Sequence, residues 1–227
     1  METNTPSKNK QIMGVASILI LIAVLSGILF IVFSRLTEKE PLSVESIDQA
    51  ILEAEDYDGS TRINPPGVLE SFTLTNQHGD KVSLDDLKGK LSLLTFGYTH
   101  CPDVCPLTLN EFKTVEAGLG DDADKVQFVF VSVDGDRDTA EALSKYFEVR
   151  DISHYQAWNG TTDKLDHLTT NLGVFYEYVD KEKNPEFYIV NHTAGSFLIN
   201  QEGQWVMRYA FGTEPEVIIE DLEAMIQ

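Results

Sequence analysis

The sequence predicts an α/β fold, and three neighbouring segments carry that prediction. Residues 91–97 and 126–133 are apolar runs of strand length, and the second is typical of a central parallel strand covered on both faces. Residues 106–118 have helical spacing, with Pro106 at the first position, where helices favour proline. A strand, a helix and a strand in this order indicate a parallel βαβ unit.

The segments around this unit extend it at both ends. Residues 71–75 and 81–84 alternate on either side of a turn-forming stretch at 76–80, which predicts a β-hairpin. After the unit we expect a helix, a short strand, a helix, a second hairpin and a closing helix, at residues 139–147, 155–158, 162–172, 195–200 with 205–211, and 215–226. This order describes a thioredoxin-like fold with an N-terminal β-hairpin and insertions.

An uncharged apolar run from Ile12 to Phe33 precedes the predicted domain. Its length matches the roughly 20 residues that a helix needs to cross the hydrocarbon core. It is longer than a secretory h-region of about 7–15 residues, and no small-residue cleavage site follows it. We therefore expect residues 12–33 to be a single transmembrane anchor rather than a buried core helix, with residues 1–11 as a short cytoplasmic tail.

The anchor implies a location for the rest of the chain. Lys8 and Lys10 lie in the short tail, which is the easier segment to retain in the cytoplasm. We expect the domain on the extracytoplasmic, periplasmic side of a cell membrane. The residues before the anchor contain no Arg-rich presequence, which favours a bacterial envelope over the mitochondrial inner membrane.

The chain beyond the anchor is strongly acidic. The formal net charge is −20, and after residue 40 the chain carries 13 basic and 34 acidic side chains. Such a polyanion repels nucleic acid and anionic lipid headgroups, so both are excluded as partners of this part. Residues 34–65 are polar and acidic with three prolines, which predicts a tether, and the globular pattern predicts a domain at residues 66–227.

Both cysteines of the chain, Cys101 and Cys105, lie where strand 91–97 ends and helix 106–118 begins. Strand ends in α/β proteins open into crevices that hold functional sites. The backbone N–H groups of the first helical turn favour thiolate over thiol at this place. Three residues separate the cysteines, whereas a dithiol redox motif has two.

A fixed disulfide is the structural alternative for this pair. Residues four apart on a helical turn lie about 6 Å apart, within bridging range. A bridge across so short a loop stabilises little through chain entropy. A redox-active or metal-bound pair explains the position better than a fixed disulfide does.

Five histidines could complete a ligand set. We expect His78, His154 and His167 at the surface because their surroundings are polar. His100 precedes Cys101 directly and is expected to point away from the thiols. His192 follows the apolar run 187–190 and lies where the late hairpin begins, beside the first helical turn in this fold. Spacing alone leaves open whether His192 is a ligand or a structural residue.

Two thiolates and one imidazole form a soft, three-coordinate donor set. Soft sulfur ligands select Cu(I), whereas a structural zinc site needs a fourth ligand. An extracytoplasmic location is also compatible with copper as the bound metal.

Three segments resemble the Sco/SenC family, namely Phe96–Pro106, Val131–Asp134 with Arg137–Thr139, and Tyr188–Thr193. These are membrane-tethered, thioredoxin-fold copper proteins that help to assemble cytochrome c oxidase, and the similarity spans about residues 66–222 and the N-terminal anchor. The resemblance implies that Cys101, Cys105 and His192 bind copper, as Cu(I) and also as Cu(II). It further implies an upstream copper donor, and delivery of copper to the binuclear copper centre of oxidase subunit II or reduction of that subunit's cysteines.

Some positions depart from the family pattern. Most relatives carry Asp before the ligand histidine, but this chain has Asn191, and an amide would orient the imidazole more weakly than a carboxylate. Leu107 and Thr108 replace a more acidic stretch, which we expect to affect partner contacts. Asp134 ends the central strand and is either an acceptor that supports the site or a helix-capping or turn carboxylate.

Two functions remain open on this reading. The first is a copper chaperone without turnover, and the alternative is a thiol–disulfide oxidoreductase that acts on partner cysteines without copper transfer. The three-residue spacer favours the first, as does His192 at the place where dithiol oxidoreductases of this fold carry a cis-proline. A thiol pair can always exchange, so one protein can have both activities. A peroxidase is disfavoured, because its chemistry needs one activated thiol and not two on one turn.

Overall fold

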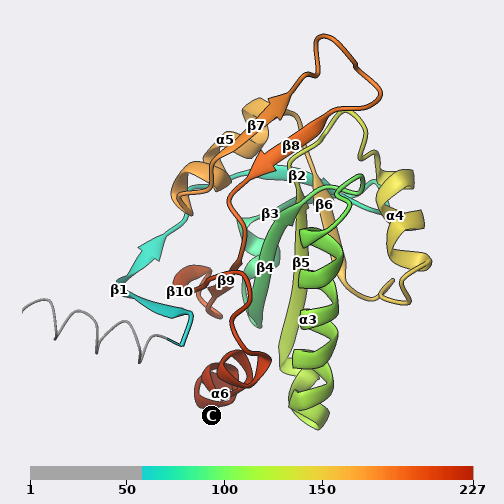
Figure 1. Ribbon diagram of the computed structural model, residues 1–227. Helices are drawn as coiled ribbons and strands as arrows, with labels where there is room; N and C mark the ends of the chain where they lie inside the picture. Colours follow the sequence, from blue (N-terminus) through green and yellow to red (C-terminus); the bar gives the residue numbers. More distant parts are fainter. Residues whose placement is uncertain (1–57, 227) are drawn as a thin grey trace, which may run out of the picture. The chain divides into compact units, whose positions relative to one another are not determined.

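The structure, a computed structural model, describes residues 58–226. Ten strands and four α-helices are assigned there (Figure 1). The strands are β1 (Ser60–Val68), β2 (Thr73–Asn76), β3 (Lys81–Ser83), β4 (Leu91–Gly97), β5 (Val126–Ser132), β6 (Gln156–Asn159), β7 (Tyr176–Val179), β8 (Ile189–His192), β9 (Ser196–Ile199) and β10 (Gln204–Tyr209). The helices are α3 (Val104–Leu119), α4 (Ala140–Glu148), α5 (Thr162–Asn171) and α6 (Pro215–Ile226), with 3₁₀ turns η1 (Leu84–Leu87) and η2 (Gly120–Lys125).

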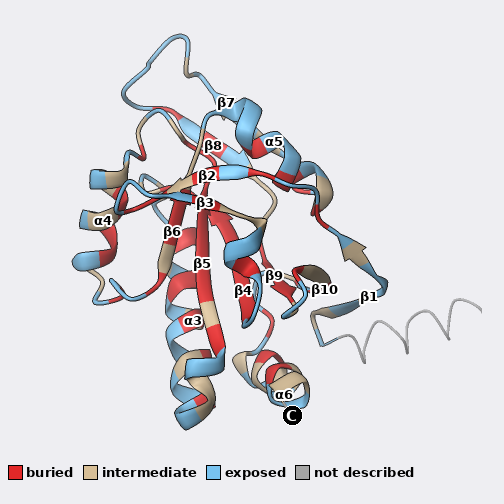
Figure 2. Ribbon diagram, turned by 180° about the vertical axis from the view of Figure 1, so that it is seen from behind, coloured by how far each residue is buried: buried red, intermediate tan, exposed pale blue. Residues whose placement is uncertain are grey.

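Eight of the strands form one mixed sheet in the order β1-β10-β9-β4-β5-β6-β2-β3. At its centre β4 and β5 run parallel, with Leu91 opposite Val126, and α3 connects them, so the predicted βαβ unit is confirmed. Every residue of β4 is buried, as Figure 2 shows, and α3, with helix α6 packed beside it, covers one face of the middle of the sheet. The large aromatic side chains of this core, such as Phe112 and Phe130, each stabilise the fold by about 1.5–3 kcal/mol through burial.

Both predicted hairpins are present. Strands β2 and β3 pair antiparallel with Leu74 opposite Val82, and β9 pairs antiparallel with β10. Helix α3 starts earlier than the sequence predicts: Val104 is its first residue and Pro106 its third. The proline is tolerated because the first turn of a helix has no intrahelical partner for its N–H groups. As a consequence Cys105 lies inside the first turn of α3.

The predicted tether ends too late. Residues 60–65 lie in β1, which pairs antiparallel with β10, with Ser60 opposite Tyr209. The register shifts between Arg62 and Gly67, where Pro65 and Pro66 interrupt the ladder. An edge strand tolerates prolines because one of its sides forms no ladder. In a sequence, two adjacent prolines argue against a strand, so β1 was not predicted.

Strands β7 and β8 form a separate two-stranded sheet, which we call the ribbon and which the sequence did not predict. Figure 1 shows it at the end of the molecule opposite α6. Tyr176 pairs with His192 and Tyr178 with Val190 in its ladder. The last residue of the ribbon is therefore the histidine that sequence analysis singled out.

Within residues 58–226, no helix combines the length and apolar character needed to cross a membrane. The predicted tail 1–11, the predicted anchor 12–33 and most of the predicted tether lie outside the described residues.

Candidate metal centre

The two cysteines lie at the junction of β4 and α3, as predicted. The N–H of Cys101 donates to the carbonyl of Tyr98 at 3.1 Å, which closes a turn after β4. The N–H of Cys105 then donates to the Sγ atom of Cys101 at 3.4 Å. Both thiols are free, Cys101 half-buried and Cys105 only 3 % exposed. The pair therefore combines one accessible sulfur with one enclosed sulfur.

Gly97 makes room for the enclosed sulfur. A Cβ atom at this position would lie 2.9 Å from Sγ of Cys105 and 2.6 Å from the ring of Phe130, both too close for real contacts. The absence of a side chain at the end of β4 lets Cys105 pack directly against the strand. The position of the sulfur thus depends on the backbone of the central sheet.

His192 comes from the ribbon and meets Cys105. Its Nε2 atom lies 3.7 Å from Sγ of Cys105, and its Nδ1 atom lies 3.0 Å from the carbonyl oxygen of Thr193. Since a carbonyl only accepts, Nδ1 carries the hydrogen of the neutral ring and the Nε2 lone pair faces the sulfur. The ring of Tyr98 packs edge-on against the imidazole, with centroids 6.2 Å apart. The structure thus brings His192 to the cysteine pair.

Burial favours the uncharged forms of Cys105 and His192. Desolvation strongly raises the pKa of the Cys105 thiol, and it lowers the pKa of His192 below its usual 6.5 against the opposing effect of the Thr193 carbonyl. The pKa of the Cys105 thiol is thus shifted in the direction opposite to the one that its place at a helix start predicts, first through burial and then through the hydrogen bond with Cys101. At neutral pH the metal-free site holds a thiol and a neutral imidazole.

The other histidines lie elsewhere. His154 pairs with Glu116 at 2.8 Å and His167 with Glu70 at 3.3 Å, and both rings are more than half exposed. His78 is exposed in the β2–β3 turn. These three predictions of surface positions are confirmed. His100 is exposed and hydrogen-bonds to Thr99, as expected for a residue outside the thiol group.

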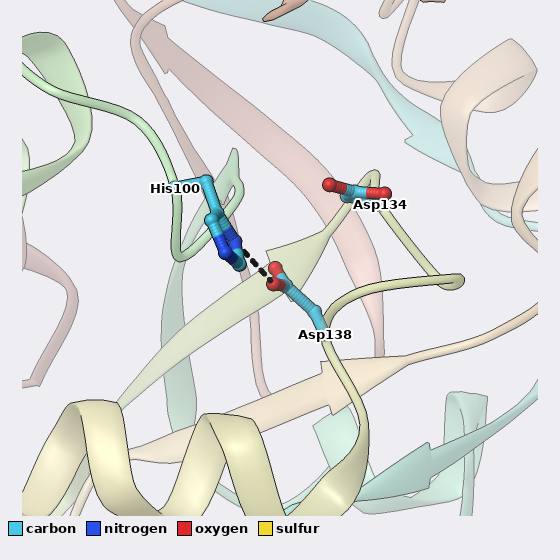
Figure 3. Close-up of side chains that lie close together, drawn as sticks. All are labelled: His100, Asp134 and Asp138. Atoms are coloured by element: carbon cyan, nitrogen blue, oxygen red, sulfur yellow. Dashed lines mark ion pairs between the residues drawn. The ribbon is translucent and has the colours of Figure 1, made fainter. Parts of the chain in front are cut away.

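His100, Asp134 and Asp138 also lie close together, with ligand atoms within 4.8 Å of one another (Figure 3). Their carboxylates are already occupied by hydrogen bonds. Asp138 accepts from the N–H and hydroxyl of Thr99 and from the hydroxyl of Ser132, and Asp134 accepts from Arg137 and Tyr188. The two carboxylates of this cluster therefore connect the loop between β5 and α4 to Thr99, which follows β4, and to Tyr188, which precedes β8. Burial raises the pKa of Asp138, against the hydrogen bonds that lower it.

Of the roles that the sequence left open for Asp134, the cap of α4 is excluded, and the side chain is a buried hydrogen-bond acceptor. The cap of α4 is Thr139, whose hydroxyl accepts from the N–H of Ala142. The buried Asp134 carboxylate instead pairs with Nε of Arg137 at 2.6 Å and accepts from the hydroxyl of Tyr188. Sequence reasoning missed Arg137 and Tyr188 as members of this region, although the Asp-x-x-Arg spacing was a signal for a local ion pair.

Asn191 does not orient the imidazole. Its Nδ2 atom donates to Oε1 of Glu177 at 3.1 Å, on the face of the ribbon opposite His192. The carbonyl of Thr193, and not the side chain of residue 191, accepts the Nδ1 hydrogen of the imidazole. Leu107 is 51 % exposed and available to a partner, but Thr108 is buried and its hydroxyl donates to the carbonyl of Val104.

The structure resembles solved structures of known proteins. ScoI of Bradyrhizobium japonicum with copper bound is 35% identical and superposes with a TM-score of 0.62, covering 70% of this chain and 99% of that one. The apo Sco1 protein of Thermus thermophilus is 32% identical with a TM-score of 0.65, covering 74% and 96% of the two chains. These likenesses confirm the predicted thioredoxin-like α/β fold.

Sequence comparisons agree with this likeness. An SCO2-like protein of Rickettsia prowazekii is 28% identical over 91% of this chain and 95% of its own length. The mitochondrial SCO2 homologue of mouse is 31% identical over 68% of this chain and 61% of its own length. The family model described as SCO1/SenC matches residues 61–227. The chain therefore belongs to the SCO1/SenC family.

Proposed function

We propose that this protein is a copper-binding assembly factor for cytochrome c oxidase, which delivers copper to the binuclear copper centre of subunit II or maintains the thiols of that centre. The observation that carries the proposal is the 3.7 Å approach of His192 Nε2 to Cys105 Sγ, beside Cys101. The related ScoI of Bradyrhizobium japonicum was solved with copper bound, which supports copper as the metal.

The chemistry of Cys101, Cys105 and His192 suits Cu(I). Two sulfurs and one imidazole nitrogen are soft or intermediate donors, and Cu(I) accepts low coordination numbers that zinc does not favour. Asp134 and Asp138, the two buried carboxylates of the loop between β5 and α4, already accept hydrogen bonds and offer no free fourth ligand. The Nε2 lone pair is directed at the sulfur before any metal arrives.

Protons accompany copper binding. The pKa of Cys105 is raised by burial, so this thiol keeps its proton in the metal-free protein and releases it when the sulfur coordinates. His192 is already neutral because burial lowers its pKa, so it binds without losing a proton. Cys101 is the accessible sulfur, and we infer that an acceptor protein displaces Cys101 first, while Cys105 and His192 still hold the ion.

Thiol exchange is the second candidate, and the asymmetry of the two free thiols favours it. The Cys101 sulfur attacks a partner disulfide and forms a mixed disulfide, with one partner thiol released. The Cys105 sulfur then attacks Cys101, which closes a Cys101–Cys105 disulfide and releases the second partner thiol. Two electrons and two protons pass to the partner, and no other reductant is needed.

The proposal includes the parts of the chain that precede the described residues. Residues 1–11 form a cytoplasmic tail, residues 12–33 a single membrane anchor and the following acidic residues a tether. The domain then acts on the extracytoplasmic side, where oxidase subunit II and an upstream copper donor are its partners. Supporting this, the uncharged run at 12–33 has the length of a membrane span, and the acidic domain is unsuited to nucleic acid.

One experiment separates delivery of copper from thiol reduction. The copper-loaded chain is mixed with the reduced, metal-free copper domain of oxidase subunit II, and the reduced metal-free chain is mixed with the oxidised domain. His192→Ala should abolish copper transfer and retain disulfide reduction, whereas Cys101→Ser should abolish both. If the parent chain transfers no copper but reduces the disulfide, the thiol function replaces the copper function.

A further inference from the structure

The ligands of the proposed site come from two different sheets. Cys101 and Cys105 follow β4 of the eight-stranded sheet, whereas His192 ends the ribbon, and no backbone ladder joins the two sheets in the described part of the chain. The chain itself connects them through residues 193–195, which lead to β9. The distance between His192 and Cys105 therefore also depends on side chains that pack the ribbon against the main sheet.

The loop between β5 and α4, residues 133–139, supplies several of those side chains, and Tyr98, which follows β4 and packs against His192, supplies another. The Arg137 guanidinium donates to the carbonyl oxygen of Tyr188 at 3.0 Å and lies 3.4 Å from the centre of the Tyr188 ring. Asp134 is fully buried, pairs with Arg137 at 2.6 Å, and accepts the hydroxyl hydrogen of Tyr188. Tyr188 immediately precedes β8, so this contact fixes the start of the strand that ends in His192.

Two further contacts join the same loop to the ribbon. The hydroxyl of Tyr178 donates to the carbonyl of Val133 at 2.9 Å, and Lys181 pairs with Asp136 at 2.7 Å. The loop at residues 133–139 therefore contacts both sides of the ribbon, through Tyr178 and Lys181 on the β7 side and through Tyr188 on the β8 side. The Asp134–Arg137 pair is the buried part of this contact, so removing one partner leaves the other charge buried without its counter-charge.

The same loop also holds the cysteine side of the site. Asp138 accepts the N–H of Thr99 at 2.9 Å and the hydroxyl of Ser132 at 2.6 Å, and the N–H of Val133 donates to the carbonyl of Gly97 at 2.9 Å. These bonds fix the turn that leads into Cys101. One loop therefore contacts both the segment that carries the thiols and the segment that carries the imidazole.

We propose that Asp134 and Arg137 are positioning residues that set the distance between His192 and the thiol pair. They bind no metal themselves, and they act through Tyr188 on the strand that carries His192. This inference rests on the proposed function in one respect, since the positioned atoms are the proposed copper ligands. Removing the buried pair should loosen the imidazole and leave the two thiols as the copper ligands.

A double-mutant cycle on the full-length reduced chain tests this role. Cu(I) affinity is measured by competition with a chromogenic Cu(I) chelator for the parent, Asp134→Asn, His192→Ala and the double variant. Asp134→Asn should weaken binding at least about tenfold in the parent, the range typical for residues that orient a ligand. In the His192→Ala background it should change binding by less than about twofold, because the histidine it positions is gone.

Copper-edge spectroscopy gives a second readout. The Asp134→Asn protein loaded with Cu(I) should show the reduced nitrogen coordination of His192→Ala, with sulfur coordination unchanged. Asp221→Asn is the matched control, because Asp221 also accepts a tyrosine hydroxyl, from Tyr209, and pairs with an arginine, Arg62. That variant should lose some thermal stability and keep the copper affinity of the parent.

If Asp134→Asn fails to fold, Tyr188→Phe takes its place in the double-mutant cycle. It deletes only the hydroxyl that donates to Asp134 and keeps the ring beneath Arg137, so it should weaken Cu(I) binding in the parent but not in His192→Ala. Equal losses in both backgrounds, or no loss in either, overturn the positioning role. If His192→Ala itself binds Cu(I) like the parent, the three-ligand site of the proposed function fails instead.

Discussion

The Nε2 atom of His192 lies 3.7 Å from the Sγ atom of Cys105, although 87 residues separate them in the chain. Cys105 lies in the first turn of α3, behind the central strand, and His192 ends the ribbon. Their contact joins a soft sulfur and a neutral imidazole in a water-poor site with one accessible sulfur, Cys101, beside it. That arrangement can hold a soft metal ion and still admit an exchanging partner.

Gly97→Ala should damage both the fold and the site. The new Cβ would lie 2.9 Å from Cys105 Sγ and 2.6 Å from the Phe130 ring, so the sulfur must move. We expect a loss of about 1–3 kcal/mol in the free energy of unfolding and weaker Cu(I) binding. Gly118→Ala in α3, which meets only the end of the Ile219 side chain, should keep the copper affinity. Unchanged affinity in Gly97→Ala would show that the sulfur position is not set by this contact.

Asn191→Asp should change stability rather than copper binding. Residue 191 lies opposite Glu177 in the ribbon and donates to its carboxylate, so an aspartate there places two negative charges side by side. We expect a loss of about 0.2–1 kcal/mol in stability, smaller at high salt, and Cu(I) affinity within about twofold of the parent. Adding Glu177→Gln should restore stability. A tenfold change in affinity would mean that residue 191 does act on the imidazole.

Glu111→Gln should stabilise the protein increasingly as the pH rises from about 4.5 to about 7, and by a constant amount above that. Burial in α3 raises the pKa of Glu111 from its ordinary 4.5 to about 7. Between these values the folded chain keeps a proton that the unfolded chain has lost, so this residue lowers stability as pH rises. At pH 8 the variant should exceed the parent by about 1–2 kcal/mol, after allowance for partial exposure.

The comparison is made by denaturant unfolding at two pH values. At pH 4 both states of the parent are protonated at this position, so parent and variant should have equal stability. A stabilisation of Glu111→Gln that is the same at pH 4 and pH 8 would contradict the assignment to the carboxyl proton.

Iodoacetamide should modify Cys101 before Cys105. Cys101 is half-buried, whereas Cys105 is 3 % exposed and burial raises its pKa. We expect at least about a tenfold difference in rate, because only the thiolate reacts and access adds to the effect. Peptide mass spectrometry of the metal-free reduced chain measures both sites, and unfolding in denaturant should make the two rates equal. Equal rates in the folded chain would remove the basis for Cys101 as the exchanging sulfur.

The sequence predicted the centre of the fold because that part follows local rules. Residues 91–97 and 126–133 are mostly apolar and carry no charge, and both contain central parallel strands. Strand β1 was missed because Pro65 and Pro66 argue against a strand, and only its edge position next to β10 makes them tolerable. The ribbon was missed because β7 and β8 are four residues each and are separated by a polar loop.

The site shows a similar division. Cys101 and Cys105 could be singled out from their place at a strand end, since a local pattern defines it. His192 could not be assigned by spacing alone, because its position depends on packing between two sheets. For Asp134 the sequence offered a supporting acceptor as one alternative, but its contact with Tyr188 and the contact of Arg137 with the same residue could not be read, because Tyr188 lies 51 residues beyond Arg137 in the chain. The pKa of Cys105 was misjudged because burial cannot be read from a helix start.

Cu(I) binding by the full-length reduced chain and its His192→Ala variant tests the central claim most directly. The parent should bind one Cu(I), and His192→Ala should bind Cu(I) at least about a hundredfold more weakly. Mutation of a residue that only supports a metal ligand lowers the metal affinity by up to about a hundredfold, and loss of the ligand itself should cost at least as much. His154→Ala, which removes a surface histidine paired with Glu116, should bind like the parent. If His192→Ala also binds Cu(I) as tightly as the parent, Cys101, Cys105 and His192 are not the copper site.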